Sequence, residues 1–243
     1  MRLEGRKALV TGASRGIGRA ISLAFADEGA DVAATARSLE ALEETWAEIE
    51  ARGRRCHAMA WDVRDVSQAE QRLEDAAEAL GGLDIVVNNA GVHHLPDGPD
   101  GRADSEAEWD YVMDTNLKAV WFITEAAARM MAREGGAVVN IASDYAFRGA
   151  NTIYGVSKWG VAGLTRGLAR NWAGRGVRIN AIGPGPVATE MIGWEEGDAL
   201  ESDHLPLGRL TLPDEVARVA VFLASDDASA LIGETIVLNT GNP

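Results

Sequence analysis

The stretch Thr11-Gly12-Ala13-Ser14-Arg15-Gly16-Ile17-Gly18 decides the fold expected for this chain. It follows an apolar, β-branched run at Lys7–Thr11 that predicts a strand, and it leads into a helical pattern at Gly18–Glu28. Glycines permit a tight turn and a close approach of the backbone to a phosphate, which then meets the positive end of the helix dipole. The spacing Gly-x-x-x-Gly-x-Gly differs from Gly-x-Gly-x-x-Gly but serves the same physics. Because the loop joins a first strand to a first helix, we predict a dinucleotide-binding turn.

The rest of the chain repeats this alternation of short apolar runs with longer amphipathic ones. Further strands are expected at Asp31–Ala36, His57–Trp61, Asp84–Asn88, Ala137–Ala142, Val177–Ile182 and Thr235–Asn239. Further helices are expected at Leu39–Arg52, Ser67–Leu80, Glu106–Glu134, Tyr154–Ala173 and Pro213–Ala224. Strands that alternate with helices indicate βαβ units. The pattern predicts an α/β protein with a three-layer, doubly wound Rossmann fold, in which helices flank a seven-stranded parallel sheet.

Composition limits the classes of function. The 243 residues, 47% apolar and 25% charged, suit one globular domain spanning residues 1–243. A formal charge of −14 repels polyphosphate and anionic membrane surfaces, so neither nucleic acid nor membrane is an expected partner. No apolar run approaches the length of a membrane span, and the N-terminus lacks the features of a signal peptide. Cys56 is the only cysteine, which rules out an internal disulfide and favours a cytoplasmic location.

The residues after the second expected strand bear on the choice of dinucleotide. NAD sites of this architecture usually place Asp or Glu here, to accept a hydrogen bond from the ribose 2′-hydroxyl. Ala36 holds that place, Arg37 follows it, and Arg15 lies in the glycine loop. Two guanidiniums suit a 2′-phosphate through charge-assisted, often bidentate hydrogen bonds. We therefore predict NADP(H) rather than NAD(H), the alternative being that both arginines are ordinary surface residues.

Tyr154 and Lys158 stand four residues apart in a chain with only three tyrosines and three lysines. On a helix, this spacing puts both side chains on one face, with their Cβ atoms about 5–6 Å apart. An ammonium beside a phenol lowers the phenol's pKa from roughly 10, so that it can act as an acid or base near neutral pH. The alternative is a solvated tyrosine that packs on the lysine stem.

The loop at 91–101 precedes the helix expected at Glu106–Glu134 and is rich in turn-forming residues. Ser105 and Glu108 are expected to form a capping box at the start of that helix. The loop contains His93 and His94, but no third metal ligand is obvious, so we expect a partly exposed histidine pair and no metal.

Together these motifs resemble the short-chain dehydrogenase/reductase family over nearly the whole chain. The loop at 11–18 looks like the family's cofactor loop, and Asp62-Val63 resembles its adenine-contacting pair. Asn88-Asn89-Ala90-Gly91 resembles the motif that stabilises the central sheet, and the segment at 180–189 resembles the part that closes over nicotinamide. The cofactor contacts implied are Gly12, Ser14, Arg15, Gly16, Ile17, Gly18, Arg37, Asp62, Val63, Asn89, Ala90, Gly91, Tyr154, Lys158, Pro184, Gly185, Val187 and Thr189.

Four residues match the family's catalytic positions, namely Asn116, Ser143, Tyr154 and Lys158. The resemblance implies that Tyr154 is the acid in reduction and the base in oxidation, while Lys158 lowers its pKa and binds the nicotinamide ribose. Ser143 is expected to hydrogen-bond the substrate oxygen, and Asn116 to hold a water that relays protons from Lys158 to solvent. The gap between Ser143 and Tyr154 is about two residues shorter than is usual in the family. Such a gap predicts either a narrower cleft or a displaced serine.

The activity so implied is hydride transfer between NADP(H) and a carbonyl or secondary alcohol. The short substrate lid is expected near 189–208, and its part at 190–198 carries many carboxylates. These carboxylates favour small neutral ketones over anionic substrates by like-charge repulsion, unless they all face solvent. One alternative is 3-oxoacyl-(acyl-carrier-protein) reduction, which needs a basic patch such as Arg129 with Arg133 or Arg166 with Arg170. A lesser alternative is a protein that senses NADP(H) without turnover.

The two longest expected helices, Glu106–Glu134 and Tyr154–Ala173, have apolar faces wider than one sheet contact requires. In the family, such helices pair between subunits. The resemblance therefore implies a homo-oligomer, either a dimer or a tetramer, with closed symmetry.

Overall fold

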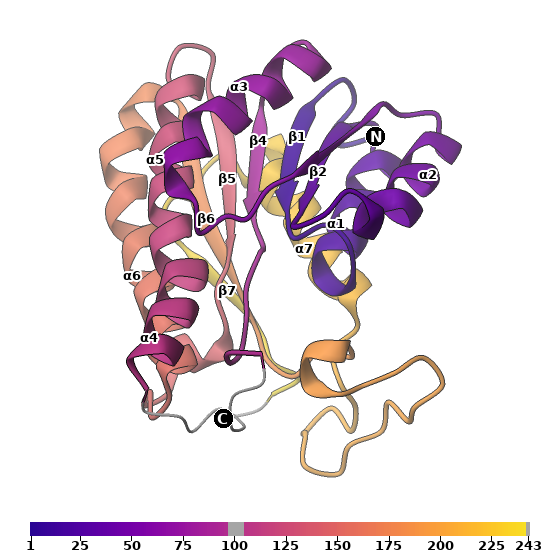
Figure 1. Cartoon of the computed structure of the whole chain (residues 1–243), viewed down its shortest axis with the longest axis vertical. Helices are drawn as coiled ribbons and strands as arrows, with labels where there is room; N and C mark the ends of the chain where they lie inside the picture. The colour runs from indigo at the N-terminus through magenta and orange to yellow at the C-terminus, as the bar shows by residue number, and fades with distance from the viewer. Residues whose placement is uncertain (97–104, 242–243) are drawn as a thin grey trace.

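The computed structural model describes residues 1–96 and 105–241, and within these ranges seven parallel strands form one sheet. Their order across the sheet is β3-β2-β1-β4-β5-β6-β7 (Figure 1). The strands are β1 Lys7–Thr11, β2 Asp31–Ala36, β3 Cys56–Ala60, β4 Ile85–Asn88, β5 Gly136–Ile141, β6 Val177–Pro184 and β7 Thr235–Leu238. The predicted doubly wound α/β fold is confirmed, and each expected strand is present.

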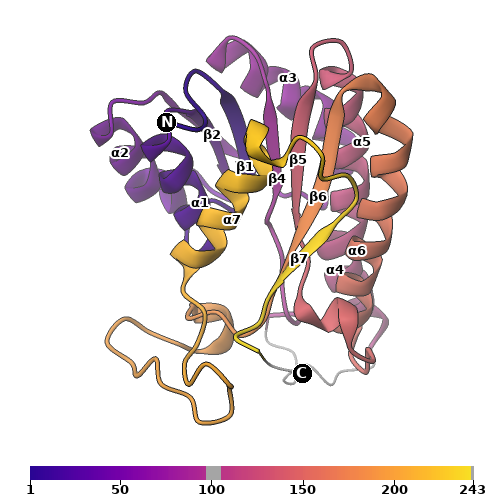
Figure 2. The same ribbon diagram turned by 180° about the vertical axis from the view of Figure 1, so that it is seen from behind.

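Helices cover both faces of the sheet. One face carries α1 Gly16–Asp27, α2 Glu43–Ala51 and α7 Pro213–Ala224, of which α7 lies in front of β1 in Figure 2. The other face carries α3 Ala69–Leu80, α4 Glu106–Met113, α5 Ala119–Met131 and α6 Ile153–Trp172. None of the helices in the described ranges is both long and apolar enough to cross a membrane.

The core consists of two apolar layers, one on each face of the sheet. Side chains alternate between the faces along a strand. In β1, Leu9 therefore packs with the layer under α3 and α5, whereas Ala8 and Val10 pack with the layer under α1 and α7. All three are fully buried, which explains why these strands read as continuous apolar runs.

The helix expected at Glu106–Glu134 is interrupted, so this prediction was wrong in one respect. A π-helical turn at Asp114–Lys118 separates α4 from α5, and Asn116 lies within it. The apolar periodicity continues across the turn, where the buried Asn116 amide bonds outside its own helix, to Val92 and Ser157. At the start of α4, only the serine half of the expected capping box is present, because the Glu108 N–H donates to Ser105 Oγ at 3.1 Å. The Glu108 carboxylate accepts from the Leu95 N–H at 2.7 Å.

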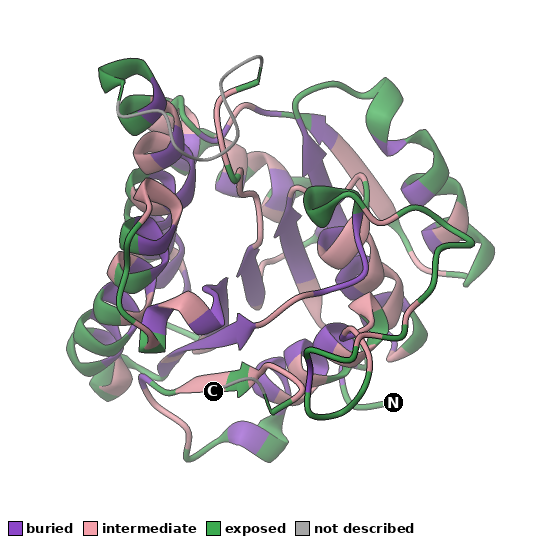
Figure 3. Ribbon diagram, turned by 90° about the horizontal axis from the view of Figure 1, so that it is seen from below, coloured by how far each residue is buried: buried purple, intermediate pink, exposed green. Residues whose placement is uncertain are grey.

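The carboxyl ends of the strands form the edge that Figure 3 shows from below, where buried strands meet exposed loops. The chain order reverses between β1 and β4, whose neighbours β2 and β5 continue in opposite directions. Ligands of doubly wound sheets bind at such a reversal. The glycine loop follows β1 and Asn89 follows β4, so both stand at this point.

Candidate active site

The glycine loop is packed too tightly for larger residues. Gly12 and Gly16 adopt φ angles of +65° and +54°, which disfavour any side chain. A Cβ at Gly18 would lie 2.1 Å from the Gly12 carbonyl oxygen and 2.4 Å from Asn89 Nδ2. The loop thus brings bare backbone to the amino end of α1, which is the arrangement that a pyrophosphate requires.

Asn89 fixes this loop from the neighbouring strand. Its Nδ2 donates to the carbonyl oxygens of Thr11 and Gly12 at 2.9 and 3.0 Å. In return, Thr11 Oγ1 accepts from the backbone N–H groups of Asn89 and Ala90, both at 3.0 Å. Asn88, one residue earlier, donates to Asn140 Oδ1 at 2.8 Å and so links β4 to β5 inside the sheet. The motif at 88–91 therefore ties the sheet to the glycine loop.

Arg15 and Arg37 both lie exposed at the carboxyl edge, one in the glycine loop and one after β2. Arg64 follows β3 and forms an ion pair with Asp62, at 2.5 Å between Nη2 and Oδ2. Hydrogen bonds from Arg64, together with the positive charges of Arg64 and Arg37, hold the pKa of Asp62 below its usual range. The sequence reasoning did not include Arg64, although its position two residues after Asp62 was the available signal.

Tyr154 and Lys158 lie in the first turns of α6, whose start is fixed by Thr152. Oγ1 of Thr152 accepts from the Gly155 N–H at 3.0 Å and caps the helix. Lys158 is 4% exposed, and its Nζ lies 5.7 Å from the centre of the Tyr154 ring. Nζ also donates to the Ile141 carbonyl oxygen, at the end of β5, at 2.8 Å. The pair therefore shares one helix face beside the carboxyl edge of the sheet, as predicted.

Burial governs the titration of this pair in the protein alone. It raises the pKa of Tyr154 to about 12, although a hydrogen bond with Ser143 opposes the rise. It lowers the pKa of Lys158 from 10.5 to about 8. In the protein alone, removing a phenolate from water costs more than the Ser143 hydrogen bond returns. The lowering of the Tyr154 pKa by Lys158 stays a prediction for the protein with its cofactor.

Ser143 lies just beyond β5, where it begins a short 3₁₀ helix at Asp144–Phe147. Its hydroxyl lies 3.3 Å from Asp144 Oδ1 and 3.3 Å from the Pro184 carbonyl oxygen, both of which can accept from it. Ser143 and Tyr154 line the same cavity, and Ser143 lies close enough to lower the pKa of Tyr154. Both readings of the short gap, a narrower cleft or a displaced serine, stay predictions.

Asn116 is fully buried, and its amide is held by three hydrogen bonds. Nδ2 donates to the Val92 carbonyl oxygen at 2.8 Å and to Ser157 Oγ at 3.1 Å, while Oδ1 accepts from the Val92 N–H at 2.8 Å. Both amide hydrogens are thereby engaged, which leaves further acceptor capacity on Oδ1. A Cβ at Gly91 would lie 3.3 Å from Asn116 Oδ1 and 3.5 Å from Lys158 Nζ, so the two groups flank the same glycine.

These residues border one cavity of about 360 Å³ at the carboxyl edge. The predicted residues that line it are Arg15, Gly16, Ile17, Gly18, Asn89, Gly91, Ser143, Tyr154, Lys158, Pro184, Gly185, Val187 and Thr189. Gly12, Ser14, Arg37, Asp62, Val63, Ala90 and Asn116 lie outside this lining. The cavity brings together the glycine loop and three of the four side chains predicted to be catalytic, whereas Asn116 and the residues expected to contact adenine lie outside its lining.

The cavity also holds residues that the sequence reasoning missed as site residues. The His93 ring packs against Tyr154 with 4.8 Å between ring centres, and Tyr145 meets Tyr154 edge-on at 6.0 Å. Partial burial, and then the neighbouring His94, lower the pKa of His93. Over residues 1–96 and 105–241, no group of three or more His, Cys, Asp or Glu side chains could hold a metal. The loop expected at 91–101 continues past residue 96 outside the described residues.

Comparison with known proteins agrees with this geometry. A family model described as enoyl-(acyl carrier protein) reductase matches residues 12–242. The chain is 39% identical to D-threitol dehydrogenase of Mycolicibacterium smegmatis, covering 99% of this chain and 94% of that protein. It is 38% identical to 3-oxoacyl-(acyl-carrier-protein) reductase of Thermotoga maritima, covering 99% of each chain.

Among solved structures, a short chain dehydrogenase from Burkholderia cenocepacia in complex with NADP superposes with a TM-score of 0.88. It is 35% identical, and the match covers 100% of this chain and 99% of that one. The chain therefore belongs to the short-chain dehydrogenase/reductase family.

Proposed function

We propose that this protein is an NADP(H)-dependent oxidoreductase that transfers a hydride between the cofactor and a carbonyl or secondary alcohol. The observation that carries the proposal is the convergence of Ser143, Tyr154 and Lys158 on one cavity with the glycine loop. The three side chains would supply a proton donor, a charge that stabilises its conjugate base and an oxygen-binding hydroxyl, beside a backbone suited to bind phosphate.

The residues at the carboxyl edge fit a dinucleotide phosphate. The glycine loop and the amino end of α1 would hold the pyrophosphate. Gly16 in this loop lies close to Thr189, since a Cβ at Gly16 would meet Thr189 Cγ2 at 3.3 Å. Arg15 and Arg37 would bind the 2′-phosphate, while Asp62 and Val63 would contact adenine. Preference for NADP(H) is further supported by the Burkholderia cenocepacia relative, which was solved with NADP. The residues at 184–189 would cover the nicotinamide.

Proton transfer is assigned to Tyr154. Bound NADPH supplies the hydride and NADP⁺ accepts it. In reduction, the Tyr154 hydroxyl gives its proton to the carbonyl oxygen as negative charge develops there, and in oxidation the phenolate takes the proton back. Ser143 donates a hydrogen bond to the same oxygen. Lys158, with Nζ 5.7 Å from the Tyr154 ring centre, would stabilise the phenolate by its charge and would also bind the nicotinamide ribose.

Asn116 is assigned a supporting role near Lys158. Its Oδ1 retains acceptor capacity and flanks Gly91 together with Lys158 Nζ. A water held there would connect the lysine to solvent, so that the proton lost from Tyr154 is replaced after each turnover. The three hydrogen bonds that fix the amide make this a rigid position for such a water.

We further propose that the segment at 189–208 is a substrate lid and that the substrate is a small neutral ketone or the corresponding alcohol. Glu190, Met191 and Ile192 line the cavity, so this segment supplies both a carboxylate and apolar contacts. A carboxylate at the mouth disfavours anionic substrates by repulsion. The lid therefore suits uncharged substrates.

The second candidate is 3-oxoacyl-(acyl-carrier-protein) reduction, favoured by 38% identity to the Thermotoga maritima reductase. An acidic carrier protein needs a basic docking patch. In one candidate patch, Arg129 already pairs with Glu70 at 2.9 Å and with Glu125 at 3.4 Å, which leaves Arg133 as its other cation. Arg166 and Arg170 are both exposed on α6 and remain as the other patch.

A screen that follows NADPH absorbance tests the proposal and separates these candidates. Purified protein is assayed against neutral ketones, aldehydes, sugars and an acetoacetyl thioester, with NADH as the parallel cofactor. Turnover of neutral ketones with NADPH supports the main proposal, while turnover of the thioester alone supports the second candidate. NADPH binding without turnover of any substrate supports the lesser alternative of a non-catalytic NADP(H) sensor.

We infer that the chain forms a homo-oligomer through the face between α5 and α6. A groove of about 760 Å³ on this face is lined largely by apolar residues, among which Trp121 and Phe122 are each 46% exposed. Gly163 and Gly167 on α6 leave open space above the helix, which allows a second helix to approach closely. A second copy of the same face would cover these rings and build a symmetric interface, in a dimer or within a tetramer.

Light scattering after size exclusion tests this interface. Phe122→Glu should shift the protein toward the monomer, whereas Trp46→Glu, at an aromatic of similar exposure on α2, should leave its mass unchanged. A wild-type monomer at micromolar concentration would contradict the inference.

The single Cys56, which allows no internal disulfide, supports a cytoplasmic location, and cell fractionation checks it.

A further inference from the structure

The residue after Ser143 is an acid buried in the wall of the cavity. Asp144 is 2% exposed and lines the same cavity as Ser143 and Tyr154. A carboxylate is seldom buried unless partners offset the loss of water. The mechanism proposed above gives this carboxylate no task.

The charge of Asp144 is balanced and held in place by a neighbouring arginine. Arg148, one helical turn later, forms an ion pair with Oδ2 of Asp144. The guanidinium of Arg148 also lies 5.6 Å from the centre of the Tyr145 ring, which fixes its position. A Cβ at Gly185 would lie 3.3 Å from Oδ2, so the carboxylate also touches the segment assigned to the nicotinamide. Asp144 is therefore an ordered anion at the reacting end of the cavity.

The other oxygen of Asp144 faces the catalytic serine. Oδ1 lies 3.3 Å from Ser143 Oγ. When a molecule carries oxygens on adjacent carbons, those two oxygens are about one hydrogen-bond length apart. That spacing is similar to the distance between Ser143 Oγ and Asp144 Oδ1. If Ser143 binds the reacting oxygen, the neighbouring oxygen falls beside Asp144. A carboxylate has about four acceptor positions, so Asp144 can accept from a substrate hydroxyl while it keeps Arg148.

We propose that Asp144 is a specificity-determining residue that accepts a hydrogen bond from a hydroxyl beside the reacting carbon, so that the substrates are α-hydroxy ketones and vicinal diols. In reduction, the carbonyl carbon receives the hydride of NADPH and its oxygen receives the Tyr154 proton. The adjacent hydroxyl keeps its proton throughout and donates it as a hydrogen bond to Asp144. This inference rests on the proposed oxidoreductase function and names its substrate class.

The chemistry of the site explains the expected selectivity. A simple ketone places a methyl or methylene group against the buried carboxylate, which then loses water without gaining a donor. A site built to bind a hydroxyl rejects the analogue that lacks it more strongly than an apolar pocket rejects an extra group. An acyl thioester likewise offers Asp144 no hydroxyl donor next to its keto group, so this substrate is disfavoured.

Matched substrates test the inference. Butanone and acetoin differ by one hydroxyl on the carbon beside the carbonyl, and cyclohexanone with its α-hydroxy derivative forms a second pair. With NADPH, the wild type should reduce the hydroxy ketone of each pair with kcat/KM about 10- to 100-fold above that of the plain ketone. Asp144→Asn and Asp144→Ala should bring this ratio close to one while the kcat/KM for the plain ketone is retained or rises.

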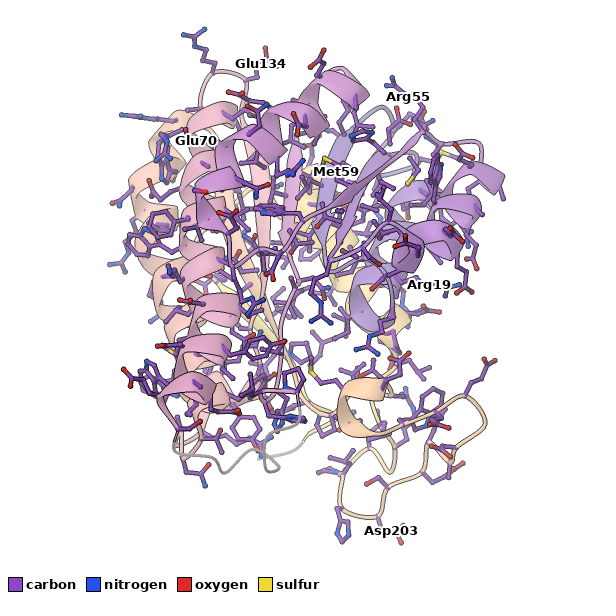
Figure 4. All side chains as sticks on the ribbon, in the orientation of Figure 1. Arg19, Arg55, Met59, Glu70, Glu134 and Asp203 are labelled. Carbon is purple, nitrogen blue, oxygen red and sulfur yellow. The ribbon has the colours of Figure 1, made fainter. Side chains whose placement is uncertain are left out.

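Glu134→Gln is the control, because Glu134 is an exposed carboxylate after α5, at the end of the molecule opposite the carboxyl edge of the sheet in Figure 4. It should keep the wild-type ratio. A wild-type ratio near one overturns the inference and leaves the proposed function standing, and this outcome needs no folded variant. The inference is also overturned if Asp144→Asn keeps the wild-type ratio of kcat/KM between the hydroxy ketone and the plain ketone. An equal loss of kcat/KM for both ketones would show that Asp144 has only a structural role, which overturns the inference too. Failure of the wild type to turn over any ketone or alcohol of either pair overturns the inference together with the proposed function.

Discussion

Replacing Gly18 with alanine should damage both the fold and the cofactor site, since this position has no room for a methyl group. The added Cβ would lie 2.1 Å from the Gly12 carbonyl oxygen and 2.4 Å from Asn89 Nδ2. Neither neighbour can yield cheaply, because the first is backbone and the second is the amide that clamps the loop. Overpacking of this kind costs about 1–3 kcal/mol. For a chain of this size, such a loss lowers Tm by roughly 2–12 °C.

The same substitution should weaken NADPH binding at least about tenfold, because the loop must move away from the geometry that receives the pyrophosphate. Thermal unfolding followed by circular dichroism gives Tm, and quenching of tryptophan fluorescence gives the Kd of NADPH. Gly149→Ala is the matched control, since a Cβ at this exposed glycine meets nothing within 4 Å. A Gly18→Ala protein with the Tm and NADPH affinity of Gly149→Ala would refute the reasoning.

Three other perturbations probe the cofactor specificity, the buried charge and the fold. Arg37→Asp should raise the Kd of NADPH about 10- to 100-fold and leave that of NADH nearly unchanged, with Arg133→Asp as the inert control in fluorescence titrations. Lys158→Met should lower kcat but raise Tm at pH 7, because burial lowers the pKa of Lys158 to about 8 and its charge destabilises the fold below that pH. The stability of the wild type then rises as the pH increases from about 8 toward 10.5, the pKa of Lys158 in the unfolded chain. The difference in Tm between Lys158→Met and the wild type should therefore shrink over this pH window, and a difference that grows would contradict the assignment. Arg178→Leu should cost about 2–4 kcal/mol in chemical denaturation, because the guanidinium donates to four carbonyl oxygens at the end of α7 and beyond it, and an unchanged midpoint would show that these bonds are dispensable.

Local patterns were sufficient to predict the sheet. Runs such as Asp31–Ala36 are buried over their whole length, so their apolar character is continuous and their ends are marked by loops. The break between α4 and α5 could not be predicted in this way. The apolar face continues through Asp114–Lys118, while Asn116 within the π-helical turn bonds outside its helix, to Val92 and Ser157. Such bonds depend on tertiary neighbours that no local pattern contains.

In the candidate site, too, some features could be predicted from local sequence and others depend on the tertiary structure. The positions of Ser143, Tyr154 and Lys158 could be read from motifs, because each motif fixes one side chain on one element. The raised pKa of Tyr154 could not, since it depends on how far the folded chain removes the phenol from water. The role inferred for Asp144 needed the distance to Ser143 and the ion pair with Arg148, both of which depend on the folded path of the short connecting segment.

The central claim is that Tyr154 transfers the proton in an NADP(H)-dependent hydride transfer. The most direct measurement uses the variant Tyr154→Phe with NADPH bound. A ketone that the wild type reduces is added, and the oxidation of the bound NADPH is followed over a single turnover. The Kd of NADPH is measured on the same preparation. Removing one hydroxyl leaves the packing of the ring against His93 nearly intact, so binding should match the wild type. The rate should fall by at least about 10²- to 10⁴-fold, as expected when a general acid is lost. Turnover within a few-fold of the wild type, with NADPH bound normally, would contradict the account.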